Sequence, residues 1–66
     1  MKEYIVCYTL ENDIKQERFF KEKEVNRQDV IQEVLDKILY QNSFMAKNDQ
    51  GEFWIHSSSI RYVRVL

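Results

Sequence analysis

The chain has 66 residues, of which 44% are hydrophobic and 32% charged, and its ten basic and eleven acidic side chains give a formal net charge of −1. This length allows one domain, residues 1–66, and an aromatic content of 14% excludes a disordered chain. The near balance of charge excludes a protein drawn to nucleic acid or to anionic membrane by a large basic excess.

The first two predicted elements are strands. Lys2 to Leu10 (KEYIVCYTL) is rich in β-branched and aromatic residues and is apolar on both of its alternating faces, as a central strand is. Glu11 to Asp13 supply turn-forming residues, and Ile14 to about Val25 (IKQERFFKEKEV) follows as a more polar strand. Together the two segments predict a hairpin.

The cysteine content and the hydropathy of the sequence indicate the cellular compartment of the protein. Cys7 is the only cysteine, so an internal disulfide is excluded, and we expect a buried thiol that acts as a small hydrophobic residue. No apolar stretch approaches the ~20 residues needed to span a bilayer, and no signal-peptide pattern is present. We therefore expect a cytoplasmic protein without membrane contact.

A helix is predicted after Asn26, which is a favourable N-cap residue and has Asp29 three positions later. The apolar residues that follow repeat at i, i+1, i+4 and i+5, the pattern of a single helical stripe. They are Val30, Ile31, Val34, Leu35, Ile38 and Leu39. We expect the helix to end near Tyr40 to Asn42, with Asn42 in the left-handed conformation.

Three short strands are predicted in the remaining sequence. Phe44 to Ala46 and Phe53 to Ile55 flank a polar turn, in which Gly51 can supply a positive φ. Ser57 to Ser59 form a break before a last strand from Ile60 to Leu66. The predicted order is β-β-α-β-β-β, an α+β fold with a single helix packed on one face of a small antiparallel sheet.

The sequence has too few of the residues on which enzyme motifs depend. One histidine and one glycine exclude a P-loop, a Rossmann fingerprint and a histidine-rich metal site. We expect no catalysis, no cofactor and no metal. His56, followed by Ser57 to Ser59, is the one polar cluster beside an aromatic residue; it either contacts a ligand or is a strand-end histidine next to a bonded turn.

A protein interface is the preferred functional hypothesis. One helix can cover one face of a sheet, so we expect several aromatic side chains to remain on an uncovered face, where they and arginine favour protein contacts. This predicts a non-catalytic interaction module, either a homodimer or an accessory subunit of a larger bacterial or phage complex. The expected interaction residues are Tyr4, Tyr8, Phe20, Trp54, His56, Arg61, Tyr62 and Arg64.

Binding of single-stranded nucleic acid is the alternative hypothesis. Arg61 and Arg64 flank Tyr62 on the last predicted strand, and Trp54 belongs to a neighbouring one. Basic and aromatic side chains on an open sheet are typical of such binders. The acidic net charge weakens the contribution from phosphate contacts, however, and no segment has the glycine and aromatic pattern of an RNA-recognition strand.

In size, in its strand-strand-helix opening and in its short C-terminal strand, the chain is loosely similar to the small accessory subunit of Gram-positive bacterial RNA polymerase. It shares no specific motif with that subunit. The lysine-, glutamate-, asparagine- and isoleucine-rich composition also resembles that of compact proteins of low-GC bacteria and their phages. This likeness is an analogy at the level of the fold.

Overall fold

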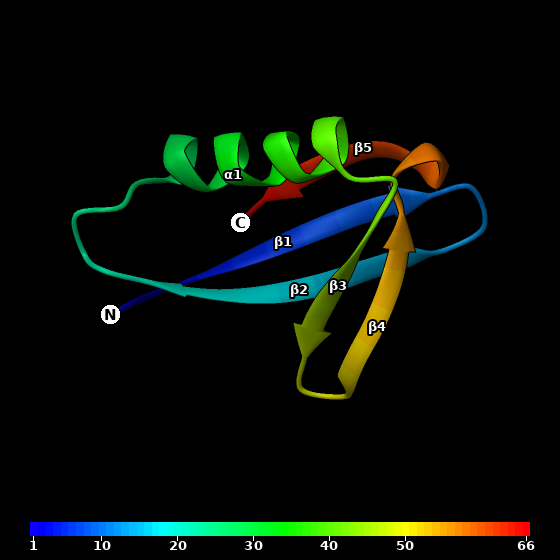
Figure 1. Ribbon diagram of the computed structural model, residues 1–66. Coiled ribbons are helices and arrows are strands. Elements are labelled where there is room, and N and C mark those ends of the chain that lie inside the picture. The colour runs from blue at the N-terminus through cyan, green and yellow to red at the C-terminus, as the bar shows by residue number, and fades with distance from the viewer.

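The computed structural model describes residues 1–66 and confirms an α+β fold with the order β-β-α-β-β-β. The strands form two antiparallel sheets: sheet A has the order β2-β1-β5, and sheet B is the β3-β4 hairpin (Figure 1). The elements are β1 (Lys2–Leu10), β2 (Ile14–Lys21), α1 (Arg27–Tyr40), β3 (Ser43–Asn48), β4 (Gly51–His56), a 3-10 turn (Ser57–Ser59) and β5 (Ile60–Val65).

The first hairpin is shorter than the sequence pattern suggests. The prediction that β2 continues to Val25 is wrong, because Lys21 pairs with Lys2 at the start of β1 and no partner strand lies beyond. The chain turns away at this point, where the Val25 amide donates to the Glu22 carbonyl over 3.0 Å. The Val25 carbonyl in turn accepts a 2.8 Å hydrogen bond from the Tyr4 hydroxyl.

The helix begins at the predicted N-cap. The Asn26 side chain accepts from the Asp29 amide, and the Asp29 carboxylate accepts from the Asn26 amide, each over 3.0 Å. This reciprocal capping box satisfies two backbone donors at the helix start. The prediction of a left-handed Asn42 is wrong: no residue other than glycine has a positive φ, and the chain leaves α1 at an extended Gln41 to enter β3 directly.

The cap gives a stability prediction. Asn26→Ala is expected to lower the free energy of unfolding by about 1 kcal/mol, because it removes the side-chain acceptor for the Asp29 amide. Urea unfolding followed by far-UV circular dichroism measures the loss. Asn12→Ala, in the exposed turn between β1 and β2, is the matched control and should change stability by less than about 0.5 kcal/mol. Equal effects of the two substitutions would contradict a capping role.

The β3-β4 hairpin is tied to the edge of sheet A. Gly51 begins β4 with a φ of 122°, the positive value predicted for this glycine. In Figure 1 the hairpin crosses β2 at a steep angle. At the crossing, the Asn48 side chain donates to the Gln16 carbonyl over 2.8 Å, and the Lys47 amide donates to the Glu17 carboxylate over 3.3 Å. The hairpin therefore contacts the β2 edge of sheet A at Gln16 and Glu17.

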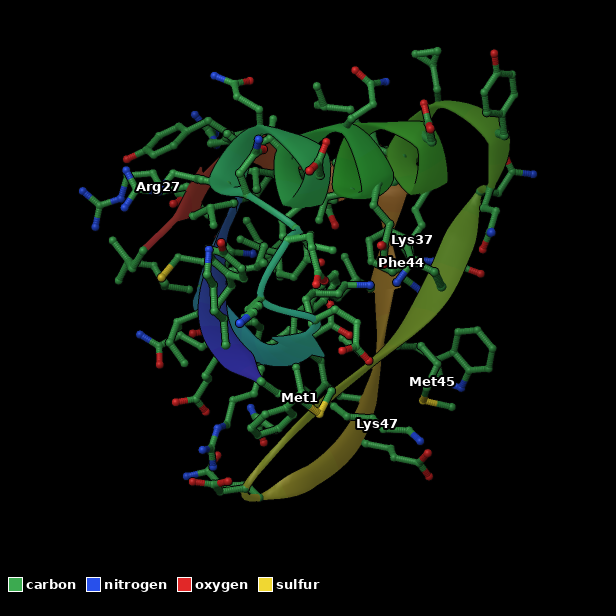
Figure 2. The ribbon with its side chains drawn as sticks, turned by 90° about the vertical axis from the view of Figure 1, so that its left-hand side faces the viewer. Met1, Arg27, Lys37, Phe44, Met45 and Lys47 are labelled. Atoms are coloured by element: carbon green, nitrogen blue, oxygen red, sulfur yellow. The ribbon has the colours of Figure 1, made fainter.

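The core lies between sheet A, α1 and the hairpin. Alternate residues of a strand point to opposite faces, and the even-numbered residues of β1 point inward. Figure 2 shows the helix above this interior, with Phe44 and Lys37 labelled at the junction of α1 and the hairpin. The buried apolar cluster comprises Tyr4, Val6, Tyr8, Phe19, Val30, Val34, Phe44, Ala46, Ile55 and Val65.

One buried polar pair lies within this core. The fully buried Tyr8 hydroxyl donates to a Glu17 carboxylate oxygen over 2.7 Å, and the second oxygen of Glu17 accepts from the Lys47 amide. Burial, and then the hydrogen bond and negative charge of Glu17, raise the pKa of Tyr8 far above its ordinary value. Every buried side-chain polar atom has a hydrogen-bond partner, so the pair is satisfied.

Candidate functional site

The structure places the predicted interaction residues in several different environments. The expectation that Tyr4 and Tyr8 lie on an uncovered face is wrong: both are buried in the core, because their face of β1 is the one covered by α1 and the hairpin. Phe20 is exposed on the opposite face of sheet A, where it pairs with Glu3. Trp54 is 63% exposed on sheet B. These four aromatic residues do not form one patch.

Among the residues proposed for nucleic-acid binding, Tyr62 and Arg64 share the outer face of sheet A, but Trp54 is separated from them. Tyr62 pairs with Thr9, so its side chain lies on the outer face of sheet A together with that of Phe20. Because Phe20 pairs with Glu3, six residues along β1 from Thr9, the two aromatic side chains are about 20 Å apart. Trp54 belongs to the other sheet. No row of aromatic side chains at the spacing of successive bases is present.

In the polar cluster at the end of β4, two serine hydroxyls are hydrogen-bonded to backbone carbonyls. His56 is exposed. The Ser57 hydroxyl donates to the Gln41 carbonyl over 2.5 Å, and the Ser59 hydroxyl donates to the His56 carbonyl over 2.7 Å. A serine whose proton is given to a backbone carbonyl is not paired with a base. The cluster therefore matches the interpretation of a strand-end histidine next to a hydrogen-bonded turn. None of its serine hydroxyls is hydrogen-bonded to the His56 side chain.

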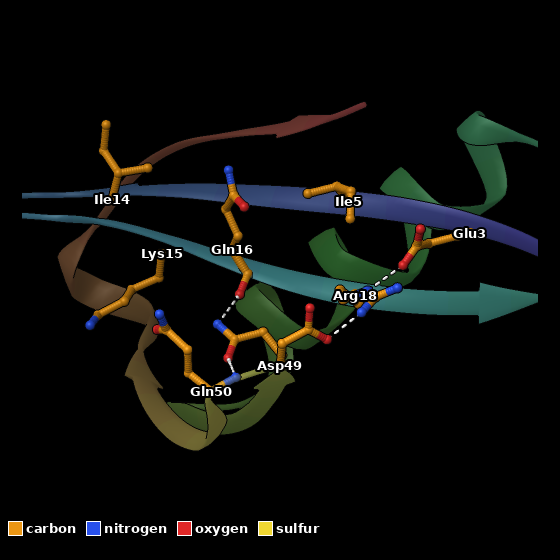
Figure 3. Close-up of a pocket in the computed structure, with 9 residues that line it drawn as sticks. Glu3, Ile5, Ile14, Lys15, Gln16, Arg18, Asp49 and Gln50 are labelled. Atoms are coloured by element: carbon orange, nitrogen blue, oxygen red, sulfur yellow. Dashed lines mark hydrogen bonds and ion pairs between the residues drawn. The ribbon is translucent and has the colours of Figure 1, made fainter.

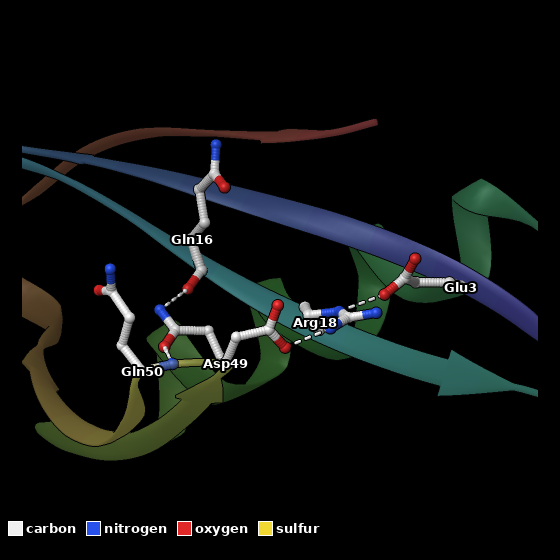
Figure 4. Close-up of polar contacts among 6 residues, drawn as sticks. Glu3, Gln16, Arg18, Asp49 and Gln50 are labelled. Carbon is white, nitrogen blue, oxygen red and sulfur yellow. Dashed lines mark hydrogen bonds and ion pairs between the residues drawn. The ribbon is translucent and has the colours of Figure 1, made fainter.

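A depression of about 540 Å³ lies between sheet A and the β3-β4 turn and is lined mainly by polar residues (Figure 3). Arg18 occupies it and forms ion pairs with Glu3 on β1 and with Asp49 in the turn (Figure 4). These two carboxylates raise the pKa of the Arg18 guanidinium, which is already charged at neutral pH. The three charges are therefore directed at one another, and the contacts fasten the turn to sheet A.

An apolar groove of about 370 Å³ lies between α1 and β5. Its lining residues are Ile31, Leu35, Ile38, Ile60, Arg61, Tyr62 and Val63. The four residues from Ile60 to Val63 are consecutive in β5. Successive side chains of a strand point to opposite faces of the sheet. A groove that contacts all four therefore runs along the edge of the strand. Arg61 is its one charged residue, and neither Arg61 nor Arg64 takes part in an ion pair.

The β5 strand is the uncovered edge of sheet A. Leu66 exchanges both backbone hydrogen bonds with Ile5, over 2.8 and 3.4 Å. Hydrogen-bonded pairs alternate with non-bonded pairs along an antiparallel ladder, and Val63 and Val65 form non-bonded pairs with residues of β1. Their amide and carbonyl groups therefore point away from β1. No strand lies on that side. Backbone donors and acceptors that can pair with an added strand thus border the apolar groove.

The α1 residues of this groove, Ile31, Leu35 and Ile38, are not among the interaction residues predicted from the sequence. The sequence predicts a single apolar stripe of six residues on a helix packed against the sheet, and of these only Val30 and Val34 are buried. Leu35 and Leu39 are 46% and 70% exposed. The width of the stripe was the available signal, because the positions i, i+1, i+4 and i+5 together cover a broader arc of the helix than a stripe of about 100° that faces the core.

Comparisons with models of protein families, with curated protein sequences and with solved structures find no match. The structure itself supplies two further constraints on the function. No helix is long and apolar enough to cross a membrane. No three side chains of histidine, cysteine, aspartate or glutamate gather in a way that could hold a metal ion. The groove and the free edge beside it form the candidate site.

Proposed function

We propose that this protein is an interaction module that binds another protein chain along the groove between α1 and the free edge of β5. The observation that carries the proposal is the combination of an apolar groove with unpaired backbone groups along the same strand. An added strand satisfies the backbone groups while its side chains fill the groove, which is the mode known as β-augmentation. Exposed apolar surface of this kind marks partner contacts.

The other exposed surfaces give less support for a docking site. The edge of β4 is also unpaired, but no apolar groove borders it. In the polar depression, the Arg18 guanidinium is already paired with the Glu3 and Asp49 carboxylates. Nucleic-acid binding, the alternative, retains Tyr62 and Arg64 on the outer face of sheet A, but Trp54 lies on sheet B. A role as an accessory subunit and a role as a homodimer are both forms of the proposed function.

The test compares a groove variant with a matched variant on the same helix. Leu35→Lys introduces a charge into the groove without altering the buried core, and Tyr40→Lys introduces the same charge at a highly exposed position outside it. The mass of each protein is measured by light scattering over a concentration series. Each is also immobilised and exposed to a bacterial lysate, with and without nuclease treatment.

The proposed function predicts that Leu35→Lys weakens association at least about tenfold, the effect of disrupting a central apolar contact, and that Tyr40→Lys binds as the wild type does. Association includes both self-association and stoichiometric retention of another protein. Equal association of all three proteins would overturn the groove as the docking site. A bound species that is lost only on nuclease treatment would favour nucleic acid instead.

A further inference from the structure

Strand β5 has a sequence that can pair with itself. Val63 and Val65 direct their backbone groups outward, so a strand added at this edge forms its hydrogen bonds at these residues. A second β5 that runs antiparallel can form a bonded pair of Val63 with Val63, centred on a two-fold axis perpendicular to the sheet. In that register the whole segment from Ile60 to Leu66 lies opposite its own copy.

We propose that the occupant of the free edge is a second copy of this chain, paired through β5 about a two-fold axis at Val63. The inference rests on the proposed function and names its partner. Two three-stranded sheets A then become one six-stranded sheet, and both α1 helices lie on the same face of it. The association is isologous, because each copy gives and receives the same contacts.

The charges are compatible in this register. Tyr62 lies opposite Arg64 of the partner subunit, in the closely spaced, non-bonded type of pair. A guanidinium placed beside an aromatic ring gains a cation–π contact. Arg61 lies opposite Val65 of the partner subunit, so no arginine directly opposes another. Arg64 forms no ion pair within one chain, which leaves its guanidinium available for the contact with Tyr62.

The exposed side of α1 completes the interface. Ile31 and Leu35 line the groove beside β5, and Leu39 continues their apolar row one turn beyond Leu35. Joining two sheets at β5 brings the two helices toward each other above the common sheet, with these rows facing. This row contains no charged residue, so the contact between the two helices is itself apolar. The pairing thus uses both the strand edge and the groove.

The test is a disulfide across the predicted pair. In a Cys7→Ala background, Tyr62→Cys and Arg64→Cys are introduced together, and the protein is oxidised with glutathione disulfide. Cys7 is removed because it lies directly opposite Arg64 within the same sheet. The Cα atoms of a non-bonded antiparallel pair are about 4.5 Å apart, within the range that a disulfide spans. Circular dichroism confirms that each variant is folded.

The expected result is a wild-type mass of twice 8.1 kDa at high concentration and a covalent dimer in most of the double variant. Tyr62→Cys alone in the same background is the control. Its two copies are diagonal neighbours about 8 Å apart, too far for a disulfide, so it should remain at least tenfold less crosslinked. Leu35→Lys should shift the wild-type dimer toward monomer.

Two results would overturn the self-pairing. One is a monomer throughout the concentration series, and the other is crosslinking of Tyr62→Cys as complete as that of the double variant. A monomer that still retains a different protein, with the retention lost in Leu35→Lys, overturns only the second copy as partner and leaves the proposed function standing. A monomer with no association that depends on Leu35 overturns both.

Discussion

Phe44→Ala is expected to lower the free energy of unfolding by about 3–5 kcal/mol. Phe44 is 3% exposed and lies where α1, sheet A and the hairpin meet, with its ring 5.8 Å from that of Tyr8 and close to the Lys37 ammonium group. A domain of this size has roughly 3–10 kcal/mol of total stability. The variant should therefore be largely unfolded at 37 °C, which thermal unfolding followed by circular dichroism measures.

The neighbouring residue provides the control. Met45 belongs to the same strand, but its side chain lies on the opposite face of the hairpin, is 37% exposed and points away from the domain in Figure 2. Met45→Ala should lower stability by less than about 1 kcal/mol, because it leaves no cavity in the core. If the two substitutions had similar effects, the hairpin would not be packed on the core as described.

Alkaline pH is expected to unfold the protein through Tyr8. Its raised pKa means that the folded state keeps the phenol proton, whereas the unfolded state loses it above the ordinary value of about 10. The stabilising contribution is therefore complete below pH 10 and is lost as the pH rises further. The folding equilibrium constant should fall about tenfold per pH unit between pH 10 and 12, as measured by urea unfolding at each pH.

Tyr8→Phe separates this effect from the titration of other groups. The variant lacks the phenol and should lose the alkaline slope that Tyr8 contributes. At neutral pH it should be less stable than the wild type by about 1.5–3 kcal/mol, because the buried Glu17 carboxylate loses its closest donor. Tyr40→Phe, at a highly exposed position, should retain the wild-type slope. An unchanged slope in Tyr8→Phe would show that another group controls alkaline unfolding.

Local patterns were sufficient to predict the elements of this fold. The helix follows from its apolar period and from Asn26, and the second hairpin follows from Gly51 between two apolar segments. The buried Cys7 agrees with its apolar neighbours. Each of these features depends on residues close in sequence, so propensity and spacing carry the necessary information.

The orientation of β1 and the grouping of the strands depend on distant residues instead. Because β1 is apolar on both faces, its sequence cannot tell which face the helix covers, and Tyr4 and Tyr8 were assigned to the wrong one. Glu17 belongs to a strand with a polar sequence, yet it is buried, because the Tyr8 hydroxyl and the Lys47 amide donate hydrogen bonds to its carboxylate. The division into two sheets likewise reflects packing between elements. The groove was missed for the same reason.

The position of β5 beside β1 has a consequence for how the chain is made. Strand β1 acquires one of its two neighbours only after β2, α1, β3 and β4 have been synthesised, since Val6 pairs with Val65. A loop that long closes slowly, and the nascent chain meanwhile exposes β1 as an unpaired edge. Interrupted synthesis would therefore release an aggregation-prone fragment, and only a finished β5 both shields β1 and creates the edge offered to a second chain.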